Sequence, residues 1–302
     1  MKVFFLGTGG TYPSKTRNVS SVAIQVGPDV VMLDCGEGTQ RQLMHSPVSF
    51  MRVRAVFITH LHADHFLGLA GLVQSMSLNG RTEPLLVMGP VGTAETAASM
   101  LGLGHFKSQF DVKIGDMRPG DQVDFEQFFV RCAEAAHTVP ALAFCVEEPP
   151  RPGRFDTAKA KALGVPPGPM YRKLQEGEAI EVDGRTVRPD EVMGAPRPGR
   201  KVVYTGDTKP CSSVESLAEG ADVLIHDSTM GSAYASQAAE FGHSTSVEAA
   251  EVAKKAGVKQ LFLVHMSPRY DDATELEAEA REVFAETTAA SDFDIYEVRY
   301  RK

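Results

Sequence analysis

Four potential metal ligands occur within the run His60-Leu61-His62-Ala63-Asp64-His65. The apolar run Ala55–Ile58 precedes them, so the group stands at the end of an expected buried strand. His60 and His62 alternate with a leucine, and both imidazoles can face one side of an extended segment. Asp64 and His65 then turn toward a neighbouring point. A solvated histidine-rich loop is the alternative, but this density of ligands favours a site for two adjacent metals.

Polar residues recur where other expected strands end. The expected strands are Val3–Leu6, Val22–Val26, Val30–Leu33, Ala55–Ile58, Leu85–Met88, Phe128–Cys132, Val202–Tyr204, Val223–Ile225 and Leu261–Val264. The potential ligands that follow them are Asp34, His137, Asp207, His226, Asp227 and His265. One aspartate at a strand end often only caps a turn. The recurrence is what predicts a site, because α/β proteins gather functional side chains along one rim of a sheet.

Helices are expected between some of these strands. Thr245 and Glu248 form a capping box for a helix over Ser246–Ala256, and Gly257 stops it. A second helix is expected over Thr274–Glu286, with Thr274 starting it in a similar way. A third, Leu67–Leu78, is apolar on more than one face and is expected to be buried. The mixture predicts an α/β protein whose sheets are covered by helices.

Composition narrows the class of protein. The chain has 302 residues with 43% hydrophobic residues, as expected of a globular protein with a sizeable core. The four cysteines form no CxxC pair and are expected to be free thiols, and no stretch is long and apolar enough to cross a membrane. We therefore expect a cytoplasmic protein. The net charge of −8 argues against a nucleic-acid partner but says nothing about local charge.

The segment from residue 147 to residue 199 differs from the rest of the chain. It is rich in proline and glycine, carries charges of both signs, and contains the run Gly164-Val165-Pro166-Pro167-Gly168-Pro169. It also separates two strands that otherwise read as neighbours. An inserted arm is the favoured interpretation, and a long surface loop is the alternative.

The chemistry of the candidate ligands points to particular metals. Imidazole and carboxylate ligands without thiolates suit zinc first, and then manganese or iron. Two metals about 3.5–4 Å apart can hold both the attacking and the leaving oxygen of a phosphodiester. A carboxylate is the natural shared ligand because each oxygen can take one metal, and Asp207 is the residue we assign to this place.

The order of these motifs resembles that of the metallo-β-lactamase superfamily. The matching elements are Asp34-Cys35-Gly36-Glu37-Gly38, the HxHxDH run, His137, Asp207 and His265. The resemblance covers essentially the whole chain, residues 1–302, as one domain. It implies a four-layer αββα sandwich with the metals at one edge of the two sheets.

Three further features resemble the ribonuclease Z family, which processes tRNA 3′ ends. They are the PxKxRN loop Pro13-Ser14-Lys15-Thr16-Arg17-Asn18, the motif Gly242-His243-Ser244-Thr245, and the segment 147–199 as a flexible exosite arm. The resemblance implies a zinc-dependent endoribonuclease that removes the 3′ trailer from precursor tRNA. A metal-bridged hydroxide is expected to attack, leaving a 3′-hydroxyl on the tRNA and a 5′-phosphate on the trailer. Manganese or another divalent metal could replace zinc.

The resemblance also implies roles for single residues. One metal takes His60, His62, His137 and Asp207, and the other takes Asp64, His65, Asp207 and His265. Asp34 orients a ligand imidazole. Asp64 accepts a proton from the attacking water, and His243 donates one to the leaving oxygen. Asp227 orients His243, although the family usually has glutamate there, so the shorter carboxylate requires a closer backbone or gives a looser pairing.

Partners follow from the same resemblance. Lys15, Arg17 and Asn18 are expected to contact RNA, and the family works as a homodimer in which one subunit's arm serves the other's site. No DNA or membrane partner is expected. Two alternatives stay open: a small-molecule hydrolase of the same fold, such as a general phosphodiesterase, and a metal-binding RNA scaffold without activity.

Overall fold

The computed structural model describes residues 1–300 of the chain, which form two compact units. The larger unit comprises Met1–Glu147 and Arg200–Arg299. The smaller unit comprises Glu148–Gly199 together with Tyr300. Within the described residues, no helix is both long and apolar enough to span a membrane.

Two seven-stranded sheets form the centre of the larger unit. The first contains, in spatial order, β16 (Ile295–Glu297), β1 (Lys2–Gly7), β2 (Ser21–Val26), β3 (Asp29–Leu33), β4 (Val53–Phe57), β5 (Leu85–Pro90) and β6 (Val112–Met117). The second contains β15 (Thr287–Ala289), β14 (Leu261–Val264), β13 (Val223–Asp227), β12 (Lys201–Tyr204), β9 (Ala141–Glu147), β8 (Phe129–Ala135) and β7 (Gln122–Asp124). From β3 to β6 and from β12 to β15 the neighbouring strands are parallel, so several strands end at the same rim of each sheet.

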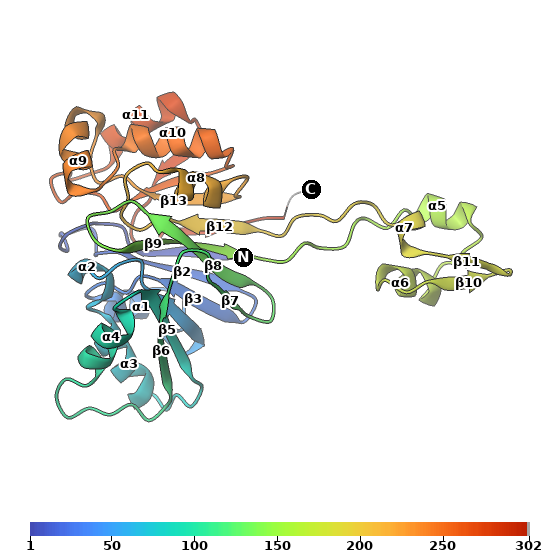
Figure 1. Cartoon of the computed structure of the whole chain (residues 1–302), viewed down its shortest axis with the longest axis horizontal. Coiled ribbons are helices and arrows are strands. Elements are labelled where there is room, and N and C mark those ends of the chain that lie inside the picture. Colours follow the sequence, from blue (N-terminus) through green and yellow to red (C-terminus); the bar gives the residue numbers. More distant parts are fainter. Residues whose placement is uncertain (301–302) are drawn as a thin grey trace. The chain divides into compact units, whose positions relative to one another are not determined.

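Helices cover the outer faces of both sheets (Figure 1). The first sheet is accompanied by α1 (Thr39–His45), the short helix η1 (Phe50–Arg52), α2 (Ala63–Phe66), α3 (Leu69–Leu78) and α4 (Thr93–Leu101). The second is accompanied by α8 (Ser212–Ala218), the short helix η2 (Ser232–Tyr234), α9 (Ala235–Phe241), α10 (Ser246–Ala256) and α11 (Thr274–Val283). This is the predicted αββα arrangement of four layers.

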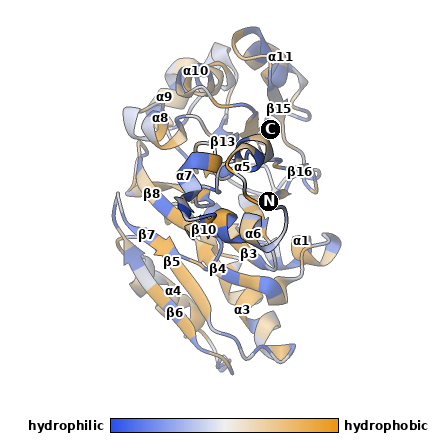
Figure 2. Cartoon of the chain, turned by 90° about the vertical axis from the view of Figure 1, so that its right-hand side faces the viewer, coloured by the Kyte–Doolittle hydropathy of each residue, from blue (hydrophilic) through white to orange (hydrophobic). Residues whose placement is uncertain are grey.

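Three apolar cores hold the layers together. The core between the sheets is rich in aromatic side chains, among them Phe5, Phe57, Phe144 and Phe262. The other two lie between each sheet and its helices. Because both faces of the central strands are covered, their sequences are almost continuously apolar, as Figure 2 shows along β4 and β5.

Most of the predicted elements form, with differences at their ends. All nine expected strands are present, and α10 begins after its Thr245 cap and ends at Gly257, whose φ of 63° suits glycine. The predicted start of the helix at Thr274 is wrong in detail. Its N-cap is Ala273, without a side-chain cap, and the helix ends at Val283, before the expected Glu286. The buried helix predicted from Leu67 begins two residues later, at Leu69.

The smaller unit has secondary structure and a small core of its own. Its elements are α5 (Thr157–Ala162), α6 (Pro169–Gln175), the hairpin β10 (Ile180–Val182) and β11 (Arg185–Val187), and α7 (Pro189–Val192). Asp156 caps α5 by accepting hydrogen bonds from two backbone amides, and Pro169 occupies the first turn of α6. The core residues are Ala160, Val165, Leu174, Ile180, Val187 and Val192.

Candidate metal centre

The potential ligands converge at one rim of the two sheets because each stands just beyond a strand. Asp34 follows β3, and His60 and His62 follow β4, all in the first sheet. The second sheet contributes His137 after β8, Asp207 after β12 and His265 after β14. Asp64 and His65 lie in α2, directly after His62. The convergence therefore follows from the parallel order of the strands.

The first group of ligand atoms comprises three imidazoles and one carboxylate. Nε2 of His60 lies 3.1 Å from Nδ1 of His62, which lies 3.2 Å from Nε2 of His137. Oδ2 of Asp207 is 3.5 Å from His60 Nε2 and 3.9 Å from His137 Nε2. Burial, reinforced by neighbouring imidazoles, lowers the pKa of His60 well below its usual value. His60 is therefore held in the neutral form that a metal requires.

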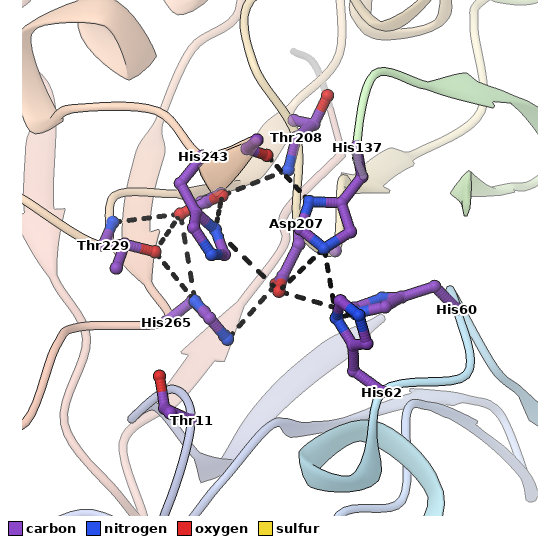
Figure 3. Close-up of polar contacts among 12 residues, drawn as sticks. Thr11, His60, His62, His137, Asp207, Thr208, Thr229, His243 and His265 are labelled. Atoms are coloured by element: carbon purple, nitrogen blue, oxygen red, sulfur yellow. Dashed lines mark hydrogen bonds and ion pairs between the residues drawn. The ribbon is translucent and has the colours of Figure 1, made fainter. Parts of the chain in front are cut away.

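The second group lies on the other side of Asp207. Oδ1 of Asp207 is 3.3 Å from Nε2 of both His65 and His265. Oδ2 of Asp64 is 3.6 Å from His65 Nε2 and 3.3 Å from His265 Nε2. Figure 3 shows Asp207 with His60, His62 and His137 on one side and His265 on the other.

Two buried polar atoms at the centre of this group of side chains make no hydrogen bond, which fits a bound cation. Nε2 of His65 and Oδ1 of Asp207 are buried, and neither makes a hydrogen bond. Buried polar atoms are rarely left in this way unless a ligand completes them. The two oxygens of Asp207 each face a different group of imidazoles. The fold and this cluster together are suited to binding divalent metal.

Asp34 holds His65 in the orientation that directs Nε2 to the cluster. Its Oδ2 lies 2.7 Å from Nδ1 of His65 and also accepts hydrogen bonds from the hydroxyls of Thr59 and Tyr204, each at 2.9 Å. Its Oδ1 accepts from the backbone N–H of Thr59 at 2.7 Å. With Nδ1–H donated to a carboxylate, Nε2 of His65 carries a lone pair that can bind a metal.

Two other imidazoles are oriented in the same manner. Nδ1 of His137 lies 2.8 Å from the carbonyl oxygen of Gly242, and Nδ1 of His265 lies 2.8 Å from Oγ1 of Thr229. Thr229 in turn donates its hydroxyl proton to Asp227 at 2.7 Å, so it accepts from His265. Each Nε2 is thereby left to face the cluster.

Asp227 also pairs with His243. Its Oδ2 lies 2.9 Å from Nδ1 of His243. The aspartate therefore reaches the ring although it is shorter than glutamate, because its backbone lies close enough to His243. Asp227 is fully buried at the end of β13. Burial alone would lower the pKa of His243, but the Asp227 carboxylate and its hydrogen bond outweigh this and raise that pKa to about 9. The neighbouring His226 joins neither ligand group and lies 2.8 Å from the carbonyl oxygen of Asp227.

The cluster opens into a cavity of about 680 Å³. The cluster residues that line it are His62, Asp64, His137, Asp207, His243 and His265. The chain packs closely against one wall at Gly10, where a Cβ atom would lie 2.4 Å from Cε1 of His265. Any larger residue at position 10 would therefore displace this imidazole.

The PxKxRN loop lies beside a separate cavity of about 580 Å³. The side chain of Arg17 donates to the hydroxyl of Thr8 at 2.6 Å and to the carbonyl of Ala290 at 2.5 Å. Nδ2 of Asn18 donates to the carbonyl of Glu37 at 2.8 Å. Lys15 is exposed. Arg17 and Asn18 thus attach the loop to neighbouring segments, and their contact with RNA stays a prediction.

Sequence reasoning missed the residues that position the ligands. Thr59, Tyr204, Thr229 and Gly242 each bond to a cluster side chain or to the carboxylate behind it. Tyr204 looks like an ordinary apolar core residue in the sequence, and its partner Asp34 belongs to the other sheet. Thr229 could have been predicted from the sequence, because it stands two residues after Asp227, where an aspartate often accepts local hydrogen bonds. Its N–H and its hydroxyl both donate to Oδ1 of Asp227.

Comparison with known proteins agrees with this geometry. A family described as "Beta-lactamase superfamily domain" matches residues 178–266, and one described as "Anti-Pycsar protein Apyc1" matches residues 1–101. Ribonuclease Z of Methanosarcina acetivorans is 45% identical over 302 residues, covering 100% of this chain and 99% of the relative. Ribonuclease Z of Methanothermobacter thermautotrophicus is 47% identical over 299 residues, covering 99% and 97%.

A solved structure supports the same relationship. The crystal structure of human tRNase Z, short form, matches with a TM-score of 0.73 and 30% identity, covering 99% of this chain and 100% of the human one. Identity at this level along the whole length, together with the fold described above, leads to one conclusion: this chain belongs to the ribonuclease Z family.

Proposed function

We propose that this protein is a zinc-dependent endoribonuclease that removes the 3′ trailer from precursor tRNA. Its products are a tRNA with a 3′-hydroxyl and a trailer with a 5′-phosphate. The observation that carries this proposal is Asp207, which lies between His60, His62 and His137 on one side and His65 and His265 on the other, in a chain 45% identical to a ribonuclease Z over its full length.

The proposed assignment places one ion in each group. His60, His62, His137 and Asp207 hold the first, and Asp64, His65, His265 and Asp207 hold the second. A pair of divalent ions supplies charge neutralisation at the phosphate and lowers the pKa of an attacking water. Zinc is the proposed metal because the ligands are imidazoles and carboxylates, a set that manganese also accepts.

Proton transfers are assigned to side chains that line the cavity. Asp64 accepts the proton of the attacking water. The Asp227 carboxylate favours the protonated ring of His243, so that the ring can donate a proton from Nε2 to the leaving 3′-oxygen. Asp227 holds the Nδ1 side of that ring at 2.9 Å and so directs Nε2 away from itself.

RNA binding is assigned to two regions outside the cluster. The arm of residues 147–199 offers several cations, including Arg172 and Lys173 in α6, and Lys15 is exposed in the PxKxRN loop. Folded RNA is recognised mainly by shape and by phosphate contacts, which a small structured unit can supply. We further propose a homodimer in the cytoplasm, in which the arm of one subunit serves the other's site.

The Asp64→Ala variant tests the proposal together with the wild type. The wild type should cut a precursor tRNA at the start of its trailer. The variant should lose this cleavage but keep most of its affinity for the RNA, measured by filter binding. Full activity in the variant would remove Asp64 from the reaction, and an RNA-binding wild type without cleavage would favour the inactive scaffold.

A further inference from the structure

Two large aromatic side chains stand exposed at the mouth of the metal cavity. Tyr12 and Phe241 both line it, and they are 60% and 49% exposed. A single exposed aromatic residue needs no explanation, but two at the entrance of one functional cavity indicate a binding surface. Neither takes part in the ligand groups or in the proposed proton transfers.

The backbone at Tyr12 is fixed next to the second ligand group. The backbone N–H of Thr11 donates to Oδ2 of Asp64 at 2.7 Å, and the N–H of Tyr12 donates to the carbonyl of Gly10 at 2.8 Å. Gly10 in turn lies against the ring of His265. The backbone that carries the Tyr12 ring is thus fixed to Asp64 and His265.

Phe241 is held in a comparable way next to the first ligand group. It is the last residue of α9, and the following Gly242 accepts a hydrogen bond from His137 at 2.8 Å. The N–H of His243 donates to the carbonyl of Ala238 at 2.8 Å, which fixes the end of the helix. The backbone at Phe241 is therefore fixed beside His137 and His243.

The backbone at Phe241 is thus fixed beside His137 and His243, and the backbone at Tyr12 beside Asp64 and His265. Figure 3 shows Thr11, next to Tyr12, on the side of His265, and His137 across Asp207. A phosphodiester centred on the cluster would extend one nucleoside toward each half. Because His243 stands two residues from Phe241 and is assigned to the leaving 3′-oxygen, the nucleoside that carries this oxygen lies on the Phe241 side.

A cation at the same mouth matches the charge of RNA. Arg269 lines the cavity, and its guanidinium lies 4.7 Å from the centre of the Tyr234 ring. Nε of Arg269 also donates to the hydroxyl of Ser267 at 3.1 Å, which fixes the side chain further. Exposed aromatic rings and an oriented arginine are the groups with which proteins hold unpaired nucleotides.

We propose that Phe241 and Tyr12 are stacking platforms for the two nucleobases that flank the scissile phosphodiester. Phe241 takes the last base of the tRNA, and Tyr12 takes the first base of the trailer. The proposal rests on the proposed function, because it assumes an RNA substrate and the assigned role of His243. It adds a binding surface for unpaired bases, which holds the phosphate in place without pairing to either base.

The test compares each variant on matched precursor tRNAs that differ by one base. One substrate is intact, one lacks the base before the cleavage point, and one lacks the base after it. Stacking on an aromatic side chain contributes enough for a loss of about 10-fold in kcat/KM when it is removed. Phe241→Ala should show this loss on the intact precursor and little further loss on the substrate without the preceding base. Tyr12→Ala should behave likewise with the following base.

Control variants separate stacking from a general disturbance. Phe241→Leu keeps an apolar side chain without a ring and should lose more activity than Phe241→Tyr. Leu103→Ala removes an apolar side chain that is 74% exposed and does not line the cavity, so it should match the wild type. Metal content and thermal melting, compared with the wild type, report whether each variant folds.

The outcomes are distinct for the two proposals. Variants that lose activity equally on intact and base-lacking substrates, or that lose none on the intact precursor, would overturn the stacking assignment while the wild type still removes the trailer. A wild type that leaves every precursor intact would overturn the proposed function, and the stacking proposal with it.

Discussion

Replacing Asp227 by asparagine should disable His243, although it removes none of the proposed metal ligands. Asp227 accepts four hydrogen bonds. Its Oδ1 accepts from the N–H of Thr229 at 2.9 Å and from the hydroxyl of Thr229 at 2.7 Å. Its Oδ2 accepts from the N–H of Thr208 at 3.1 Å and from Nδ1 of His243 at 2.9 Å. Since donors surround both oxygens, the amide group of an asparagine must face at least two of them.

The electrostatic effect can be estimated from the pKa of His243. The rise from 6.5 to about 9 corresponds to about 3 kcal/mol of preference for the protonated ring. In the metal-free protein, the raised pKa contributes stability that is complete below pH 6.5 and is lost as the pH rises through about 9. In Asp227→Asn the pKa of His243 should fall back toward its ordinary value, which a pH titration of its ring resonances by NMR measures directly.

The catalytic effect follows from the same change. General acid catalysis contributes about 100- to 10,000-fold to a rate, so we expect kcat to fall at least about 100-fold with little change in KM. The alkaline limb of the pH–rate profile should move to lower pH, because the acid loses its proton earlier. A precursor with a 3′-sulfur leaving group, which departs without protonation, should recover most of the rate. An equal loss on the oxygen and sulfur substrates would refute the assignment of His243 as the acid.

Three further perturbations test other parts of the site. Asp207→Ala should remove most bound metal, measured by elemental analysis of the purified protein, whereas Leu103→Ala, a control outside the metal cavity, should retain it. Asp34→Asn should weaken metal binding about 10- to 100-fold in a chelator competition, because His65 loses the group that orients it. Replacing residues 150–195 by a short linker should abolish precursor cleavage but spare a small chromogenic phosphodiester. The ends of β9 and β12 pair at Glu147 and Lys201, so such a linker can close the gap. Equal losses on both substrates would count against a role of the arm in RNA binding.

The sequence reveals those parts of the site that are local in the chain. The HxHxDH run can be recognised because it has four potential ligands within six residues. Asp207 and His265 can be recognised because each follows an apolar run that predicts a strand. Tyr204 could not be found in this way, because its hydroxyl bonds to Asp34, 170 residues earlier and in the other sheet. Hydrogen bonds between two sheets leave no periodic signal, and a tyrosine in a buried strand resembles any core aromatic residue.

The strands and helices, too, could be predicted only where the sequence has a clear local pattern. Central strands are apolar on both faces, and all of them except β9 were predicted. The edge strands β6 and β7 have partly exposed faces and mixed sequences, and they were missed. The helices of the arm were not predicted, for a different reason. Its α5, α6 and α7 have four to seven residues each and are separated by prolines and glycines, so no periodicity develops.

The most direct test of the account is the cleavage of a precursor tRNA by the purified protein, with the new ends identified and the metal controlled. With zinc or manganese we expect a single cut at the start of the trailer, a 3′-hydroxyl on the tRNA and a 5′-phosphate on the trailer. A chelator should abolish the cut. A precursor that stays intact with every divalent metal, or a cleavage that persists after the metal is removed, would contradict the central claim.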